Sequence, residues 1–212
     1  MINLTIGQIS FLIIVPTVVA AIIALVIFLL VRRYRIKKDF KYFYYKRIYR
    51  LAMDKDYYLI NNFLFKIDDS HVARIDHILF ADKYIYLMHD FYFAGDITGK
   101  EEDKSIIVID TKGKKVYNDN PLAINKKLMT KLSLITGINP SMLIGICIIN
   151  DDCRCGIAVN GKSHYIIQSK KLKQLVKAIE SRDIAPINKE QLAGAVKAID
   201  KLNRRKRREQ QK

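Results

Sequence analysis

The feature that most constrains this chain is an uninterrupted apolar stretch near its start. Residues 11–31 are apolar apart from Thr17, and residues 1–31 carry no charged side chain. A helix needs about 20 such residues to cross the hydrocarbon core of a bilayer, and a proline such as Pro16 is tolerated there. We therefore expect one transmembrane helix, with any folded domain restricted to the residues after it.

A secretory signal peptide is the competing interpretation of this stretch. It requires a positively charged start and a shorter apolar core, whereas residues 1–10 contain no Lys or Arg. Basic residues instead follow the stretch directly, and the positive-inside rule places such residues in the cytoplasm. We expect a single-pass protein of the cell membrane, with residues 1–10 outside and the domain in the cytoplasm.

Residues 32–50 interleave aromatic side chains with nine Lys or Arg, against the single acid Asp39. Such a segment beside a membrane is attracted to anionic lipids by roughly 1 kcal/mol per cation. Stacking plus charge also suits nucleic acid, but the adjacent apolar stretch favours the lipid surface. We expect a helix over 32–53 and a membrane-surface patch made of Arg32, Arg33, Arg35, Lys37, Lys38 and Lys41.

The formal net charge of +16 is concentrated in two flanks of the chain. Residues 32–50 carry +8 and residues 201–212 carry +6, which leaves +2 for residues 51–200. The net charge of the domain therefore gives no footprint for nucleic acid by itself. The abundance of Ile, Lys, Asn and Tyr suggests an AT-rich bacterial genome.

The rest of the sequence predicts an α/β domain with a mixed sheet flanked by helices. The apolar runs Ile75–Phe80 and Tyr84–Met88 are joined by a turn signal and predict a β-hairpin. Met142–Ile149 is a short continuous apolar run, typical of a strand buried on both faces. Asn120 and Pro121 are a helix N-cap and a first helical residue.

Further elements follow from local patterns. Strands are expected at Tyr57–Phe65, with a turn or bulge at Asn61-Asn62, and at Ser105–Asp110 and Lys115–Tyr117. The pair Asn160-Gly161 favours a hairpin between Gly156–Asn160 and His164–Gln168. Helices are expected at Lys170–Glu180 and 187–203. We expect six segments: 1–10, the transmembrane helix 11–31, the basic and aromatic helix 32–53, the domain 54–182, an amphipathic helix 183–203, and a disordered basic tail 204–212.

These segments resemble the nuclease-related domain (NERD) family, a member of the restriction-endonuclease-like PD-(D/E)xK group. Ile75-Asp76-His77 matches the family's first strand motif, and Tyr92 and Gly95 lie near its Tyr-x-Gly with one extra residue between them. The helix start Asn-Pro-Leu-x-Gln-Asn is matched by Asn120, Pro121, Leu122 and Asn125, with Ile124 in place of the Gln. The resemblance runs from about Tyr57 to Glu180 and implies a restriction-endonuclease-like fold.

The catalytic part of the family motif is degenerate. Its Glu-x-Lys positions fall on His89 and Phe91, and neither residue matches, although the metal-binding Asp is present as Asp76. In the family, the lysine charge is thought to position water or stabilise the developing phosphorane. Loss of one preorganised charge of this kind lowers a rate by about two to three powers of ten. The resemblance therefore implies the fold without efficient nuclease chemistry.

A rebuilt metal site is the alternative. Asp76, His89 and Asp90 are its candidate ligands for Mg²⁺ or Mn²⁺, with a base such as Lys83 or Lys100. His is a poor ligand for Mg²⁺, and Asp90 should point to the opposite sheet face from His89 unless the strand bulges. Without activity we expect no cofactor. The three cysteines are too few for a typical zinc site and are expected to be reduced thiols.

Three functions are consistent with these observations. The first is a membrane-tethered NERD domain without nuclease activity that binds DNA or another protein. The second is an active metal-dependent nuclease with a rearranged site, and the third is a membrane scaffold that makes only protein contacts. Loss of both Glu-x-Lys positions ranks the second function last. The residues expected to contact nucleic acid or a partner are Asn120, Asn125, Lys126, Lys127 and Lys131.

Overall fold

The structure is a computed structural model that describes residues 6–67 and 71–209, with side chains except those of 6–13, 33, 36 and 204–209. The chain divides into two compact units, Met1–Phe43 and Tyr44–Lys212. Residues 1–5 of the expected outer N-terminus, residues 210–212 of the expected tail, and the side chain of Arg33 lie outside the described residues.

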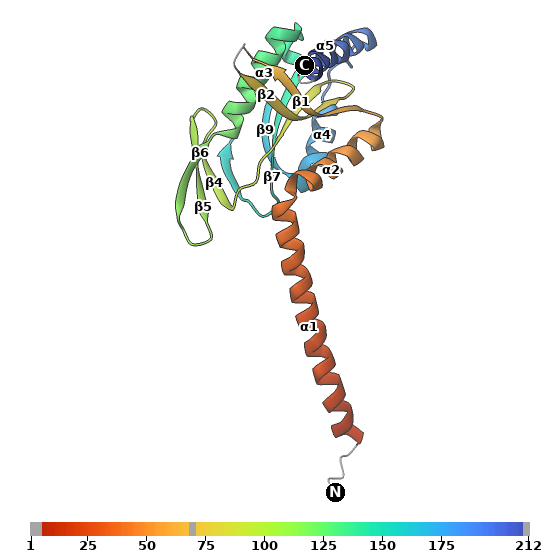
Figure 1. Ribbon diagram of the computed structural model, residues 1–212, viewed down its shortest axis with the longest axis vertical. Helices are drawn as coiled ribbons and strands as arrows, with labels where there is room; N and C mark the ends of the chain where they lie inside the picture. The colour runs from red at the N-terminus through yellow and green to blue at the C-terminus, as the bar shows by residue number, and fades with distance from the viewer. Residues whose placement is uncertain (1–5, 68–70, 210–212) are drawn as a thin grey trace. The chain divides into compact units, whose positions relative to one another are not determined.

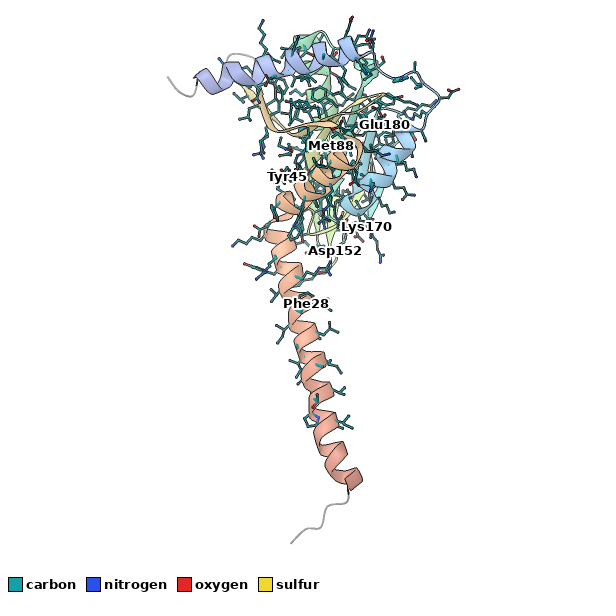
Figure 2. The ribbon with its side chains drawn as sticks, turned by 90° about the vertical axis from the view of Figure 1, so that its right-hand side faces the viewer. Phe28, Tyr45, Met88, Asp152, Lys170 and Glu180 are labelled. Carbon is teal, nitrogen blue, oxygen red and sulfur yellow. The ribbon has the colours of Figure 1, made fainter. Side chains whose placement is uncertain are left out.

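The first unit contains one long helix, α1 (Ile6–Lys38). Its segment Ile14–Arg32 has a mean hydropathy of 3.1, and its side chains, such as Phe28 in Figure 2, are exposed. Among the described residues this is the one helix long and apolar enough to cross a membrane. α1 ends at Lys38, and α2 (Phe40–Lys55) begins two residues later. The helix expected over residues 32–53 is therefore divided at Asp39.

The second unit is built on two mixed sheets (Figure 1). In the first sheet, strands β1, β2 and β3 are antiparallel neighbours, and β3, β7 and β9 continue in parallel. In the second sheet, β6, β5 and β4 are antiparallel, and β8 joins β4 in parallel. The first-sheet strands are β1 (Tyr58–Lys66), β2 (Val72–Phe80), β3 (Ile85–Asp90), β7 (Leu143–Ile149) and β9 (His164–Gln168). The second-sheet strands are β4 (Gly95–Lys100), β5 (Ser105–Asp110), β6 (Lys115–Asp119) and β8 (Cys155–Ala158).

Helices cover both faces of the first sheet. On β3, Ile85 and Leu87 belong to an apolar cluster that also contains residues of α3 (Pro121–Thr136) and α5 (Lys189–Glu209). Tyr86 points to the other face, where its hydroxyl donates to Glu180 at the end of α4 (Leu172–Glu180). α2 packs on that same face. Two short 3-10 helices, η1 (Pro140–Met142) and η2 (Ser169–Lys171), precede β7 and α4. The expected α/β fold with mixed sheets flanked by helices is confirmed.

The hairpin predicted around Asn160-Gly161 is wrong. β8 pairs with β4, whereas β9 pairs with β7, so the two strands belong to different sheets. A local turn signal does not decide strand pairing when burial against a central strand competes with it. β4 was not predicted from the sequence. Within Gly95–Lys100 a single side chain, Ile97, is buried, so the segment lacks the alternation of apolar residues that indicates a strand.

Both ends of the second unit differ from the segment boundaries expected from the sequence. In α2, Tyr44, Ile48, Leu51 and Ala52 are buried, so the compact unit begins at Tyr44 rather than at residue 54. Their i, i+4, i+7 spacing indicates a buried helical face, but the surrounding basic and aromatic residues obscured it. At the other end, α5 continues to Glu209, into the range expected to be a disordered tail.

Candidate functional site

The hairpin of β2 and β3 brings two of the predicted site residues together. Its register pairs His77 with Met88, so Asp76 and His89 are neighbours one residue further along. His89 Nδ1 lies 3.8 Å from Asp76 Oδ2, and the backbone N–H of Asp90 donates to the same oxygen at 3.1 Å. Both side chains are buried. A carboxylate and an imidazole thus occupy the place where the family resemblance implies two carboxylates.

Asp90 takes part in a separate polar cluster on the opposite face of the same strands. Its Oδ2 lies 3.0 Å from Nε2 of His77, and the other ring nitrogen of His77 lies 2.6 Å from Asn61 Oδ1. The Tyr45 ring of α2 stacks on the His77 imidazole at a centroid distance of 6.4 Å; Figure 2 labels Tyr45 and Met88. Asp90 and His89 point to opposite faces of β3, as successive residues of a regular strand do. The Asp90 carboxylate therefore contacts His77 rather than joining Asp76 and His89.

Asp76 also has a cationic neighbour that the sequence analysis did not single out. Nη2 of Arg74 lies 3.1 Å from Asp76 Oδ1, and it donates to Asn62 Oδ1 at 2.6 Å. Asn62 has a φ of 53°. In the register of β1 with β2, Asn61 and Phe63 have partners on β2 and Asn62 has none. Asn tolerates this left-handed conformation. The signal for Arg74 was present in the sequence, because residues i and i+2 of a strand share a face.

The position expected for a catalytic lysine is occupied by Phe91 in an aromatic stack. Its ring lies parallel to that of Phe93, with centroids 6.1 Å apart, and packs against the apolar cluster of the second sheet. The His89 ring lies 6.5 Å from it. Of the substitutes considered, Lys83 lies in the β2–β3 turn, where its ammonium donates to the carbonyl of Arg182, and Lys100 ends β4. Phe91, at the position where the resemblance implies the lysine, is thus held by apolar packing.

The donor set does not fit a Mg²⁺ site. Mg²⁺ prefers near-octahedral oxygen ligands, whereas Asp76 is flanked by the Arg74 guanidinium and the His89 imidazole. Within residues 6–67 and 71–209, no group of three or more His, Cys, Asp or Glu is arranged to hold a metal ion. Metal ligation by Asp76, His89 and Asp90 stays a prediction.

At the start of α3, Asn120 is a fully buried structural residue. Its side-chain amide donates to the carbonyls of Lys100, Glu101 and Asp103 at 2.8–3.2 Å. Its Oδ1 accepts the N–H of Leu122, the N-cap bond predicted from the sequence. One side chain therefore begins the helix and fixes the β4–β5 turn.

Asn125, one turn later, is also buried and ties α3 to the first sheet. Its amide donates to Leu87 O on β3 at 3.3 Å. On β7, a Cβ placed on Gly145 would lie 3.1 Å from Asn125 Oδ1 and 3.0 Å from His164 Nδ1. Gly145 lets the helix and β9 approach β7 this closely. Because Asn120 and Asn125 are enclosed, the lysines are the predicted contact residues that a partner could reach.

Lys126, Lys127 and Lys131 line one groove of about 500 Å³ on the outer side of α3. Lys126 and Lys127 are exposed, and Lys131 is half-buried. The other lining residues are Glu101, Glu102, Leu122, Ala123, Thr130 and His164. Burial, with a smaller contribution from the Lys126 charge, holds the pKa of the His164 imidazole below its ordinary value. Nothing in the sequence marked His164, because its place in the groove depends on the parallel pairing of β9.

Comparison with known proteins gives one family and no individual relative. The model of the nuclease-related domain (NERD) matches residues 41–149. No curated protein matches, and no solved structure matches. The matched range extends from the start of α2 to the end of β7 and includes both the Asp76–His89 pair and the start of α3.

Proposed function

This chain belongs to the nuclease-related domain family, and we propose that it is a membrane-anchored member that binds nucleic acid without cutting it. The observation that carries this proposal is the aromatic stack of Phe91 and Phe93 at the place of the family's lysine. Around Asp76, an imidazole and a guanidinium stand where metal-bound water would be needed. The carboxylate that would hold a metal ion is instead engaged by the Arg74 guanidinium, and no lysine occupies the position of the family's catalytic one.

α1 supports anchoring to a membrane. Ile14–Arg32 has the length and hydropathy of a span, and basic residues follow it at once. By the positive-inside rule, these residues and the domain lie in the cytoplasm. Exposed Arg32, Arg35, Lys37, Lys38 and Lys41 then face anionic headgroups. The nucleic acid would be held at the inner membrane surface.

The α3 groove supports binding of a polyanion. Lys126 and Lys127 are exposed and extend from a helix whose first two turns are anchored by buried asparagines. The anchored helix fixes the backbone positions of these lysines, and their flexible side chains can reach phosphates from there. The near-neutral domain predicts weak binding, with an affinity that falls steeply as salt rises because counterions are released.

The test uses the full chain in detergent with linear, circular and single-stranded DNA, in the presence of Mg²⁺ or Mn²⁺. We expect no cleavage, and retention of DNA that weakens with salt. Changing Lys126, Lys127 and Lys131 to Ala should reduce the slope of log K against log salt by about 3 if each lysine contacts one phosphate. The matched control changes the exposed Lys170, Lys171 and Lys177, near α4, to Ala and should leave the slope unchanged.

Two variants separate the alternatives. Cleavage that disappears in Asp76→Ala would overturn the proposal and demonstrate a rebuilt catalytic site. In the double variant His89→Glu with Phe91→Lys, which restores the family's Glu-x-Lys, new metal-dependent cleavage would show that these two positions alone removed the activity. Absence of both cleavage and DNA retention in the parent chain would favour a membrane scaffold that contacts only proteins.

A further inference from the structure

β6 is an edge strand whose five residues are all exposed. It ends the strand order of the second sheet, and within the described chain it pairs only with β5. Figure 1 shows β6 at the outer margin of this sheet. Tyr117 is 72% exposed and Val116 is 45% exposed. The strand therefore presents both an unpaired backbone edge and apolar side chains to solvent.

Edge strands of this kind invite another strand, and proteins often protect them with charges that repel a second copy. The charges of β6 do the reverse. Its sequence, Lys-Val-Tyr-Asn-Asp, has a cation at one end and an anion at the other. When the strand is laid antiparallel to a copy of itself about Tyr117, Lys115 comes opposite Asp119 at both ends.

This register is distinctive among those that β6 allows. It is the one that pairs all five residues of the strand. Because alternate residues share a face, Lys115, Tyr117 and Asp119 form one row, with a Tyr–Tyr pair between two Lys–Asp pairs. Opposite charges and aromatic rings directly across an antiparallel pair are stabilising, and like charges are destabilising.

We propose that the β6 edge binds the β6 edge of a second copy of this chain, antiparallel and centred on Tyr117. The two second sheets then form one continuous sheet across a twofold axis, and each contributes the same surface. The proposal does not depend on nucleic-acid binding, because β6 contains none of the residues that line the α3 groove.

Cross-linking in the full chain in detergent or lipid nanodiscs tests the register. In a Cys155→Ser background, which removes the exposed native thiol, Tyr117→Cys places two thiols opposite each other across the axis. A short bis-thiol reagent should link the two copies. Lys112→Cys, in the exposed β5–β6 turn, is the matched control and should not link.

Charge exchange tests the pairing itself. Lys115→Asp and Asp119→Lys should each weaken dimerisation about tenfold, because each converts two opposite-charge pairs into like-charge pairs. The double exchange Lys115→Asp with Asp119→Lys restores the pairs and should return the dimer to within about twofold of the parent. Lys112→Asp makes the same charge change outside β6 and should have no effect. A monomeric parent, a dimer indifferent to both reversals, or a double exchange as weak as the single ones would each overturn the proposal; circular dichroism verifies that every variant is folded.

Discussion

The β2–β3 hairpin and the start of α3 are the two segments on which the family resemblance rests. Their side chains differ in whether they hold the fold together or stand at positions aligned with the family's catalytic residues. At the start of α3, Asn120 and Asn125 match the family and are enclosed, where they donate to backbone carbonyls of β3 and of the β4–β5 turn. In the hairpin, the resemblance aligns the family's Glu-x-Lys with His89 and Phe91, which lie against Asp76 and in an aromatic stack.

The difference indicates which constraint acts on each segment. An asparagine that donates to several partly buried carbonyls cannot be replaced without loss of those hydrogen bonds, which lowers the stability of the fold. A catalytic carboxylate or lysine contributes little to folding and is often placed at a cost to stability. A chain that needs the fold but not the reaction can therefore lose the second kind of residue and keep the first.

Asn120→Ala should have the largest effect on stability. It removes one cap bond and the donor to three partly buried carbonyls of the β4–β5 turn, so we expect a loss of about 2–4 kcal/mol. In a chain of this size that corresponds to a fall of about 10 °C in Tm, measured by circular dichroism of the full chain in detergent. The matched control is Asn139→Ala, which removes an exposed cap of the short η1 helix and should cost less than about 1 kcal/mol. Equal effects would remove the structural distinction drawn for Asn120.

Replacing two glycines by alanine should change the free energy of unfolding in opposite directions. Gly145→Ala introduces a Cβ at 3.0 Å from His164 Nδ1 and 3.1 Å from Asn125 Oδ1, which must shift. We expect a loss of about 1–3 kcal/mol from this overpacking. Gly194→Ala lies in α5 with nothing within 4 Å and should gain up to about 1 kcal/mol from helix propensity. Thermal unfolding of both variants checks the pair; a tolerated Gly145→Ala would mean that the Asn125 contact is loose.

Most elements of the fold could be predicted because their signals are local. Ser105–Asp110 was predicted with its observed bounds, and the start of α3 with its Asn120 cap. Pairing between distant strands was not predictable: β8 and β9 flank a good turn signal, yet each joins a different sheet. Two-residue turn chemistry acts over a few residues, whereas sheet membership depends on which central strand is available.

The candidate site divides in the same way. The sequence grouped Asp76 with His89 as candidate ligands, and strand alternation placed Asp90 on the opposite face from His89. Alternation also puts Arg74 on the face of Asp76, although their ion pair was not predicted. The sequence did not reveal that His164 joins the α3 lysines, because that contact depends on a parallel crossover that adjacent residues do not encode.

His164 provides the smallest expected effect, and it concerns the pH dependence of the α3 region. Burial and the Lys126 charge hold the pKa of this imidazole below about 6.5 in the folded chain, and Glu101 opposes them. The folded state then binds the proton more weakly than the unfolded state, so this contribution to stability is present above pH 6.5 and is lost as pH falls toward the lowered pKa. Replacing the group that titrates should remove this part of the slope.

Unfolding of the full chain at several pH values between 5 and 7.5 measures the effect. His164→Gln should flatten the dependence, and Lys126→Ala should soften it because one of the charges that oppose protonation is gone. Lys170→Ala, an exposed lysine of η2, is the control. If His164→Gln keeps the full slope, protonation must be coupled to folding elsewhere in the chain.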